Sequence, residues 1–223
     1  MTSMSSRRLI DEHFVFTTRK QFKSKVESLR FAGNFLVSST SDVSQFSRVG
    51  DKELLTAATL DNGSLDLDPN DHKEVRLFQK SGIISSLVHG NGYWLSGAVL
   101  GTREEEMPFL DCELEGNEAR AAQFMDSRGT TLRGIGSIAR MVHREGDGGL
   151  NIYVKHRVEE YTVFGDEIIF VKYNLRDGLL DSNLKVNLKV GQRGDFGGVL
   201  AGWSRRDGCL YAELRAAIIE RDA

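Results

Sequence analysis

The stretch from Leu150 to Val158, LNIYVKHRV, alternates apolar and polar residues. Leu150, Ile152, Val154 and Val158 fall on one set of alternate positions, which also includes His156, and polar or charged residues stand between them. A period of two places one set of side chains on a buried face and the other set in water, as in a half-buried antiparallel strand. Most of the chain after this stretch repeats the pattern between short glycine-bearing turns. These features predict a β fold.

About eight or nine such strands are expected between residues 75 and 219, a spacing typical of a sandwich or jelly roll. No repeat with a period of about 20 to 50 residues is present, which argues against a solenoid or propeller. We therefore predict a mainly β, antiparallel sandwich or jelly roll with residues 75–219 as its core, and a single domain over residues 1–223. The predicted inward-facing residues include Leu150, Val154, Leu184 and Leu188.

The N-terminal fifty residues show a different period. Between Thr17 and Gly33, the apolar residues Phe22, Val26 and Leu29 recur at the i, i+4, i+7 spacing of an amphipathic helix. A threonine is in place as the N-cap and a glycine as the stop signal. We therefore predict a helical N-terminal segment within residues 1–50.

Charge is unevenly distributed along the chain, although the net charge is only −3. Residues 51–126 carry 6 basic and 15 acidic side chains, and residues 128–193 carry 11 and 8. Where such blocks form patches on the folded surface, they favour head-to-tail self-contact or an anionic partner. We therefore predict a homo-oligomer. The alternative is that the fold interleaves the blocks and no patch survives.

Compartment is inferred from what the sequence lacks. No apolar run reaches the ~20 residues of a membrane-spanning helix. The first residues do not contain the continuous apolar segment and cleavage site of a secretory signal. We therefore expect a cytoplasmic, intracellular protein in which Cys112 and Cys209 are reduced thiols.

A cationic row is the sharpest functional feature of the sequence. Lys155 and Arg157 occupy polar positions of the first strand, and Lys185 and Lys189 those of a second predicted strand over residues 184–190. If these strands are neighbours, they form a basic face, to which Tyr153 adds an aromatic platform for unpaired bases. Lysines that only protect sheet edges are the alternative. The predicted nucleic-acid-binding residues are Arg140, Tyr153, Lys155, Arg157, Lys172, Lys185 and Lys189.

Motifs for catalysis, cofactors and metals are incomplete. Residues 134–139 match the G-x-G-x-x-A pattern of a dinucleotide loop, but the preceding stretch is short and polar. The acidic loop over residues 61–74 lacks the glycine and the final glutamate of an EF-hand. The five histidines lack the spacing of a zinc site, and His156 has the inward register of a hydrogen-bonded core histidine. We therefore predict no catalytic residue, no metal and no cofactor.

The run VRLFQKSGIISSLVHGNGYWLSGAVLG, followed by MPFLDCEL with its Leu110-Asp111 pair, resembles the core of plant-virus cell-to-cell movement proteins of the tobamovirus-like superfamily. The resemblance covers about Val75 to Leu114. It implies a jelly-roll-like β domain that binds single-stranded nucleic acid cooperatively and acts at plasmodesmata. Asp111 is the one residue that it carries over, in a structural role.

Two hypotheses follow for function. The preferred one is a non-enzymatic protein that acts by binding or self-assembly and contacts single-stranded nucleic acid, with the viral origin that the resemblance implies. The competing one is an enzyme or small-ligand carrier with a site at one end of the sheets. A carbohydrate-binding version of the second hypothesis requires an exposed Trp94 or Trp203 in a shallow groove.

Overall fold

The computed structural model describes residues 15–19, 29–39, 42–43, 53–61, 71–80, 87–101, 107–112, 129–146, 149–157, 168–175 and 188–220. Within these ranges the chain forms strands and no helix, so the prediction of a mainly β fold is confirmed. The strands are β1 (Val15–Arg19), β2 (Leu29–Val37), β3 (Asp42–Val43), β4 (Glu53–Leu60), β5 (Asp71–His72), β6 (Glu74–Lys80), β7 (Gly92–Gly101), β8 (Phe109–Cys112), β9 (Thr131–His143), β10 (Leu150–Arg157), β11 (Ile168–Leu175), β12 (Arg193–Ser204) and β13 (Cys209–Glu220).

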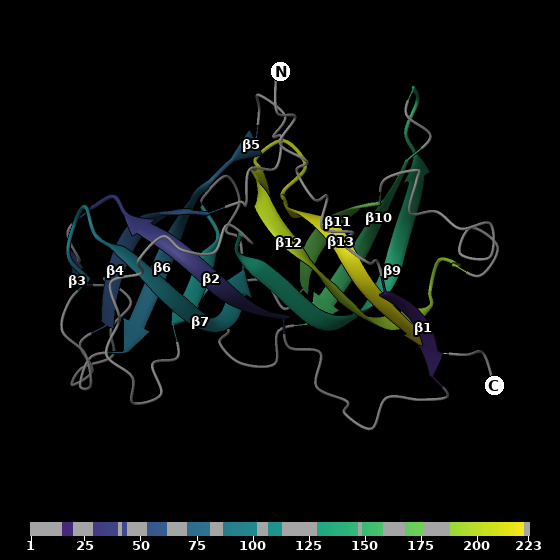
Figure 1. Cartoon of the computed structure of the whole chain (residues 1–223), viewed down its shortest axis with the longest axis horizontal. Helices are drawn as coiled ribbons and strands as arrows, with labels where there is room; N and C mark the ends of the chain where they lie inside the picture. Colours follow the sequence, from purple (N-terminus) through teal and green to yellow (C-terminus); the bar gives the residue numbers. More distant parts are fainter. Residues whose placement is uncertain are drawn as a thin grey trace, which may run out of the picture.

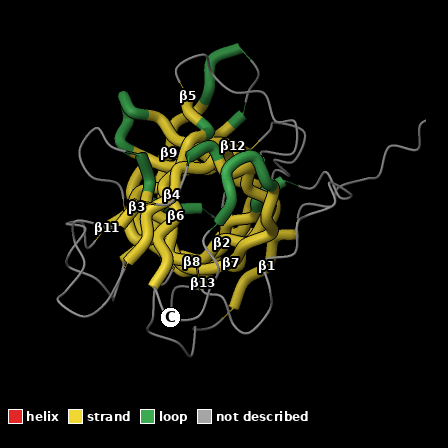
Figure 2. Tube along the Cα trace, turned by 90° about the vertical axis from the view of Figure 1, so that its left-hand side faces the viewer, coloured by secondary structure: helices red, strands yellow, loops and turns green. Residues whose placement is uncertain are grey.

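The strands close into two five-stranded rings. β2 pairs with β4 and β7, and β6 and β8 complete this N-terminal ring. In the same way β9 pairs with β10 and β12, and β11 and β13 complete the C-terminal ring. The two rings lie side by side in Figure 1. Figure 2, which looks from the N-terminal ring, shows the strands arranged around a common centre.

Both rings have the same strand order. Numbered within its own ring, each follows the order 1-2-3-5-4, and its third and fifth strands are parallel. The turn before the fourth strand is also repeated, because Gly90 N donates to the Val37 carbonyl at 2.9 Å and Gly191 N donates to the Ile138 carbonyl at 2.8 Å. Both glycines have positive φ, 83° and 91°. Since Gly191 and Ile138 each follow their counterparts by 101 positions, the chain is an internal structural duplication.

The fourth strands of the two rings carry a matching irregularity. The register shifts between Val99 and Gly101 in β7 and between Leu200 and Gly202 in β12. These positions are again 101 residues apart. An extra residue in one strand bends it and increases its twist, which helps a short sheet to close on itself.

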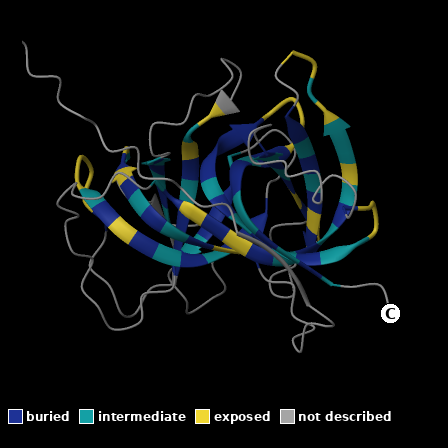
Figure 3. Ribbon diagram, turned by 45° about the vertical axis from the view of Figure 1, so that its right-hand side comes forward, coloured by how far each residue is buried: buried dark blue, intermediate teal, exposed yellow. Residues whose placement is uncertain are grey.

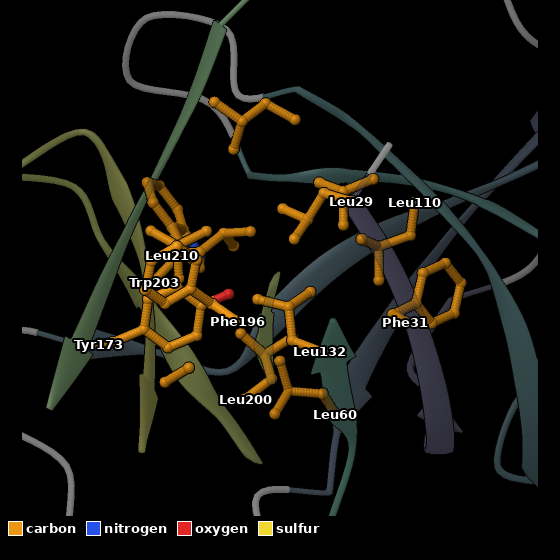
Figure 4. Close-up of a cluster of buried hydrophobic side chains, with 14 of the residues drawn as sticks. Leu29, Phe31, Leu60, Leu110, Leu132, Tyr173, Phe196, Leu200, Trp203 and Leu210 are labelled. Atoms are coloured by element: carbon orange, nitrogen blue, oxygen red, sulfur yellow. The ribbon is translucent and has the colours of Figure 1, made fainter. Parts of the chain in front are cut away.

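The first strands of the two rings join them. Leu29–Ala32 of β2 pairs antiparallel with Thr131–Gly134 of β9. One hydrophobic cluster runs through both rings, and Figure 4 shows Leu60, Leu132 and Leu200 between the buried side chains of the two sides. β1 extends the C-terminal ring by pairing in parallel with β13.

The alternation predicted for residues 150–158 is confirmed in β10. Leu150, Ile152, Val154 and His156 are buried, and the residues between them face outward. Figure 3 shows the same alternation of buried and accessible residues along neighbouring strands. Leu188 is also buried, as predicted, whereas residue 184 lies outside the described part of the chain.

Two features of the fold differ from expectation. A helix from Thr17 to Gly33 is wrong at both ends, where β1 and β2 are strands, and residues 20–28 lie outside the described residues. In β2, Leu29, Phe31 and Phe35 are buried at a period of two, which the helical spacing obscured. The described strands also close into rings, so their pairing does not show the expected sandwich or jelly roll. Alternation marks a buried face in an open and in a closed sheet alike.

Within the described ranges, no helix of the length and apolarity needed to cross a membrane is present.

Candidate nucleic-acid interface

The outer face of the C-terminal ring carries an alternating row of basic and aromatic side chains. Arg140 of β9 is opposite Tyr153 of β10, and Tyr153 is opposite Lys172 of β11. Lys172 is in turn opposite Tyr211 of β13. Four adjacent strands therefore contribute one residue each, at the ~4.8 Å spacing of neighbouring strands. We call Arg140, Tyr153, Lys172 and Tyr211 the basic–aromatic row.

Contacts within the basic–aromatic row hold its aromatic side chains in place. The Arg140 guanidinium carbon lies 5.4 Å from the centroid of the Tyr153 ring, and Lys172 Nζ lies 5.2 Å from the centroid of the Tyr211 ring. Both are cation–π contacts. The amide of Asn174 donates to the Tyr211 hydroxyl at 2.6 Å. The aromatic surfaces are therefore preorganised before any ligand arrives.

A second set of residues extends the face beyond the row. Lys155 is opposite Phe170, and Arg157 is opposite Ile168. All four are exposed, including the two apolar side chains, at 41% for Phe170 and 44% for Ile168. On a strand, side chains two positions apart are separated by about 7 Å. The face thus combines cations with apolar and aromatic surface over at least two steps along β10.

The hairpin between β12 and β13 lies against one end of the row. Lys172 Nζ is 3.7 Å from the Asp207 carboxylate in this hairpin. Arg205 and Arg206 are exposed at the same turn, and the Arg205 guanidinium lies 6.0 Å from the centroid of the Trp203 ring. The Lys172–Asp207 ion pair therefore places two further arginines close to the basic–aromatic row.

The inward side of the same strands is structural. His156 is buried, and its Nδ1 donates to the Ile135 carbonyl at 2.9 Å, because a carbonyl can only accept. Burial lowers the pKa of His156 to about 4, and the bond to Ile135 partly opposes that shift. The imidazole is therefore neutral at pH 7, and the prediction of a hydrogen-bonded core histidine is confirmed. The Tyr173 ring packs beside it, at a centroid distance of 6.2 Å.

The structure brings together five of the seven residues predicted to bind nucleic acid: Arg140, Tyr153, Lys155, Arg157 and Lys172. The expected strand over residues 184–190 is wrong over its described part. Lys189 lies in the turn before β12, where its N–H donates to Gln192 Oε1 at 2.8 Å, so it is not in a strand beside β10. Gly191, two residues further on in the same turn, has a positive φ of 91°. Lys185 lies outside the described residues.

Sequence reasoning missed several residues of this face. Arg205 and Arg206 precede the Asp207-Gly208 turn, so the sequence already placed a basic pair at a hairpin tip. The sequence gives no comparable signal for Tyr211 and Phe170, because their place on this face depends on which strands pair.

The structure also bears on Asp111, on residues 134–139 and on possible metal sites. Asp111 lies in the N-terminal ring on β8, opposite Ala98, and its charge adds to the effect of burial in raising the pKa of Cys112. Residues 134–139 lie within β9 and do not form the loop before a helix that a dinucleotide site needs. In the part of the chain that the structure describes, no three histidine, cysteine, aspartate or glutamate side chains gather into a possible metal site.

The N-terminal ring offers an internal comparison. The corresponding residues are Ser38, directly after the first strand, and Ala57, Arg76 and Phe109 on the second, third and fifth strands. Arg76 keeps a cation–π contact with Phe109, at 5.6 Å from the ring centroid. Ala57, however, stands where the C-terminal ring has Tyr153, and Phe109 is buried. The basic and aromatic character of this face is therefore specific to the C-terminal ring.

Comparison with known protein families and with curated proteins finds no match.

Proposed function

We propose that the protein binds single-stranded nucleic acid on the outer face of the C-terminal ring, without sequence preference and without catalysis. The observation that carries this proposal is the basic–aromatic row, in which Arg140, Tyr153, Lys172 and Tyr211 follow one another across four paired strands. Basic grooves with aromatic platforms are the usual means of binding single strands.

The position of the row in the fold supports the proposal. A five-stranded ring with the order 1-2-3-5-4 matches the OB fold, which binds oligonucleotides and oligosaccharides through its second and third strands and the loops beside them. Here those strands are β10 and β11, and the loop between the fourth and fifth strands is the hairpin with Arg205 and Arg206. The duplicated ring with Ala57 in place of Tyr153 shows that this chemistry is not a requirement of the topology.

The chemistry of the side chains defines the ligand. An aromatic ring stacks on the flat face of a base, which is accessible in a single strand and covered in a duplex. Lysine and arginine pair with phosphates, which are the same at every nucleotide. A face built in this way binds irrespective of sequence, and its affinity falls with salt.

The proposal extends to cooperative binding by several copies, as the resemblance to movement proteins implies. It is supported by the opposite charge of residues 51–126 and residues 128–193, which favours head-to-tail contact. Sedimentation of the protein with a long and with a short single strand tests this extension. If binding is cooperative, the long strand should sediment with several adjacent copies of the protein before any free protein is detected.

Charge reversal tests the location of the site. The variant K155E/K172E changes two cations of the proposed face, and K73E/R76E makes the same charge change on the N-terminal ring. We expect the first variant to lose most of its affinity for a fluorescent oligothymidylate at low salt, and the second to keep it. Equal losses in both would mean that only overall charge matters, and no binding by the unaltered protein would refute the proposed function. Thermal melting of both variants controls for folding.

A further inference from the structure

Three exposed apolar side chains lie on the N-terminal ring, outside the face described above. Leu36 is 44% exposed, and Val88 and Trp94 are each 55% exposed. Isolated apolar residues on a surface are ordinary, but a contiguous group marks an interaction site. We call Leu36, Val88 and Trp94 the Trp94 patch.

Strand register brings Leu36 and Trp94 together, and backbone hydrogen bonds place the turn that carries Val88 at the end of the same strands. Leu36 of β2 is opposite Gly92 of β7, so Trp94, two positions further along β7, is its diagonal neighbour. The turn with Val88 is tied to the same strand, because Val37 N donates to the Asn91 carbonyl at 3.0 Å. Val88 N donates to the Tyr93 hydroxyl, also at 3.0 Å. The patch is therefore held on hydrogen-bonded backbone.

The duplicated ring provides a control for this surface. The positions 101 residues after Leu36, Val88 and Trp94 are Ser137, Lys189 and Asp195. They occupy the corresponding strands and turn of the C-terminal ring, and all three are polar. The same ring topology therefore forms with polar side chains at these places, and the apolar residues of the N-terminal ring need another explanation.

Among the described residues, the surroundings of the patch carry no cation on the β7 side, and across β2 they include the carboxylate residue Asp61, whose N–H donates to the Asn34 carbonyl at 2.9 Å. Along the described turn 87–91 and the outward positions of β2 from Ala32 to Leu36 and of β7 from Gly92 to Ser96, there is no aspartate, glutamate, lysine or arginine. The polar groups there are the amides of Asn34 and Asn91, the hydroxyl of Ser96 and the imidazole of His89. A polyanion would have no cation to pair with at this place. A neutral ligand with many hydroxyls does not need one.

We propose that the Trp94 patch is a second binding site, distinct from the nucleic-acid face, and that it takes a neutral oligosaccharide. The indole of Trp94 offers a flat apolar surface to the C–H face of a sugar ring. The side chains of Asn34 and Ser96, beside it on the sheet, supply hydrogen bonds to the hydroxyls at the ring edge. Leu36 and Val88 extend the apolar surface for a neighbouring sugar.

Tryptophan fluorescence provides the test, because Trp94 is exposed and the other tryptophan, Trp203, is buried. The probes are cellohexaose, maltohexaose and N-acetylchitohexaose, each titrated to millimolar concentration. We expect a saturable blue shift of the emission with at least one of them. Trp94→Phe should keep most of the affinity, measured by calorimetry, and Trp94→Ala should lose about tenfold or more, as for other lost stacking contacts.

Three outcomes would overturn this proposal. One is the absence of saturable binding for all three sugars, and another is equal affinity of the unaltered protein and Trp94→Ala. The third is a monomer–dimer equilibrium that Trp94→Ala abolishes, because the patch would then contact a second copy of the chain. Nucleic-acid binding, measured on the same samples, is independent of all three, so failure here leaves the proposed function to its own test.

Discussion

The Arg140 guanidinium lies over the ring of Tyr153, and the two residues are direct cross-strand partners on β9 and β10. One face of the tyrosine ring is thereby in contact with a cation, which restricts the orientation of the ring. In the function proposed above, this one pair of residues would supply both stacking on a base and pairing with a phosphate.

Replacement of Tyr153 separates stacking from charge. Tyr153→Ala should weaken binding of a single-stranded oligonucleotide by about tenfold or more, since a stacked base contributes about 1–3 kcal/mol. Tyr153→Phe should bind nearly as well as the unaltered protein, because the ring face is retained. Fluorescence anisotropy measures both affinities. Equal affinity of the alanine and phenylalanine variants would show that no base stacks there.

Under the proposed function, Asp207 would compete with phosphate for Lys172. Its carboxylate lies 3.7 Å from Lys172 Nζ, and both side chains are partly exposed. Asp207→Asn should therefore strengthen binding by about two- to fivefold, because an exposed ion pair contributes at most about 1 kcal/mol. The matching variant Asp195→Asn removes a carboxylate that pairs with Arg133 instead. It should leave the affinity closer to that of the unaltered protein, and a larger gain from Asp195→Asn would contradict this assignment.

The substitution Gly136→Ala tests how closely the residues around His156 are packed. A Cβ added at Gly136 would lie 2.6 Å from the Lys155 carbonyl oxygen and 2.8 Å from His156 Nδ1, whereas one added at Gly197 would find its nearest atoms at 3.9 Å. Gly136→Ala should therefore lower the free energy of unfolding by about 1–3 kcal/mol. Gly197→Ala in the same ring should change it little. Urea denaturation of both variants measures the difference, and similar values would be inconsistent with this packing.

Burial of His156 makes stability depend on pH. Its pKa falls from 6.5 to about 4 on folding, so between these values the unfolded state binds the proton and the folded state does not. The free energy of unfolding should therefore fall by about 3 kcal/mol as pH drops from above 6.5 to 4, and this contribution should change no further below 4. His156→Gln keeps a donor for the Ile135 carbonyl but does not titrate, so its urea denaturation should lack this part of the pH dependence. A variant with the unaltered pH profile would exclude His156 as the cause.

The sequence predicted what depends on neighbours in the chain. The period of two in β10 identified its buried face, and the same alternation placed Tyr153, Lys155 and Arg157 together on the outer side. In β2 the local pattern misled, because Leu29 fits a helical spacing as well as the alternation that the sheet selects. Which strands pair is decided by contacts far apart in sequence, so the closure of the rings did not follow from the pattern.

The same limit applies to the site. Tyr211 belongs to the basic–aromatic row only because β11 and β13 pair in parallel. Lys189 lies outside the proposed face because a turn replaces the expected strand. The duplication was missed because the spacing of 101 holds only for the first and fourth strands and the turn before the fourth, and few residues besides Leu87 and Leu188, and Gly90 and Gly191, are identical there. Hydrogen bonds and register preserve the repeat where sequence identity does not.

The salt dependence of binding tests the central claim most directly. The affinity for a fluorescent oligothymidylate is measured at several salt concentrations for the unaltered protein, Lys155→Ala and Lys172→Ala, with Arg76→Ala as the control on the N-terminal ring. The account predicts that affinity falls linearly with salt on logarithmic axes. Each of the two lysine variants should reduce the magnitude of that slope by about 0.7, and the control should not change it. Slopes that are unchanged in both lysine variants, or an absence of binding at the lowest salt, would contradict the assignment of this face.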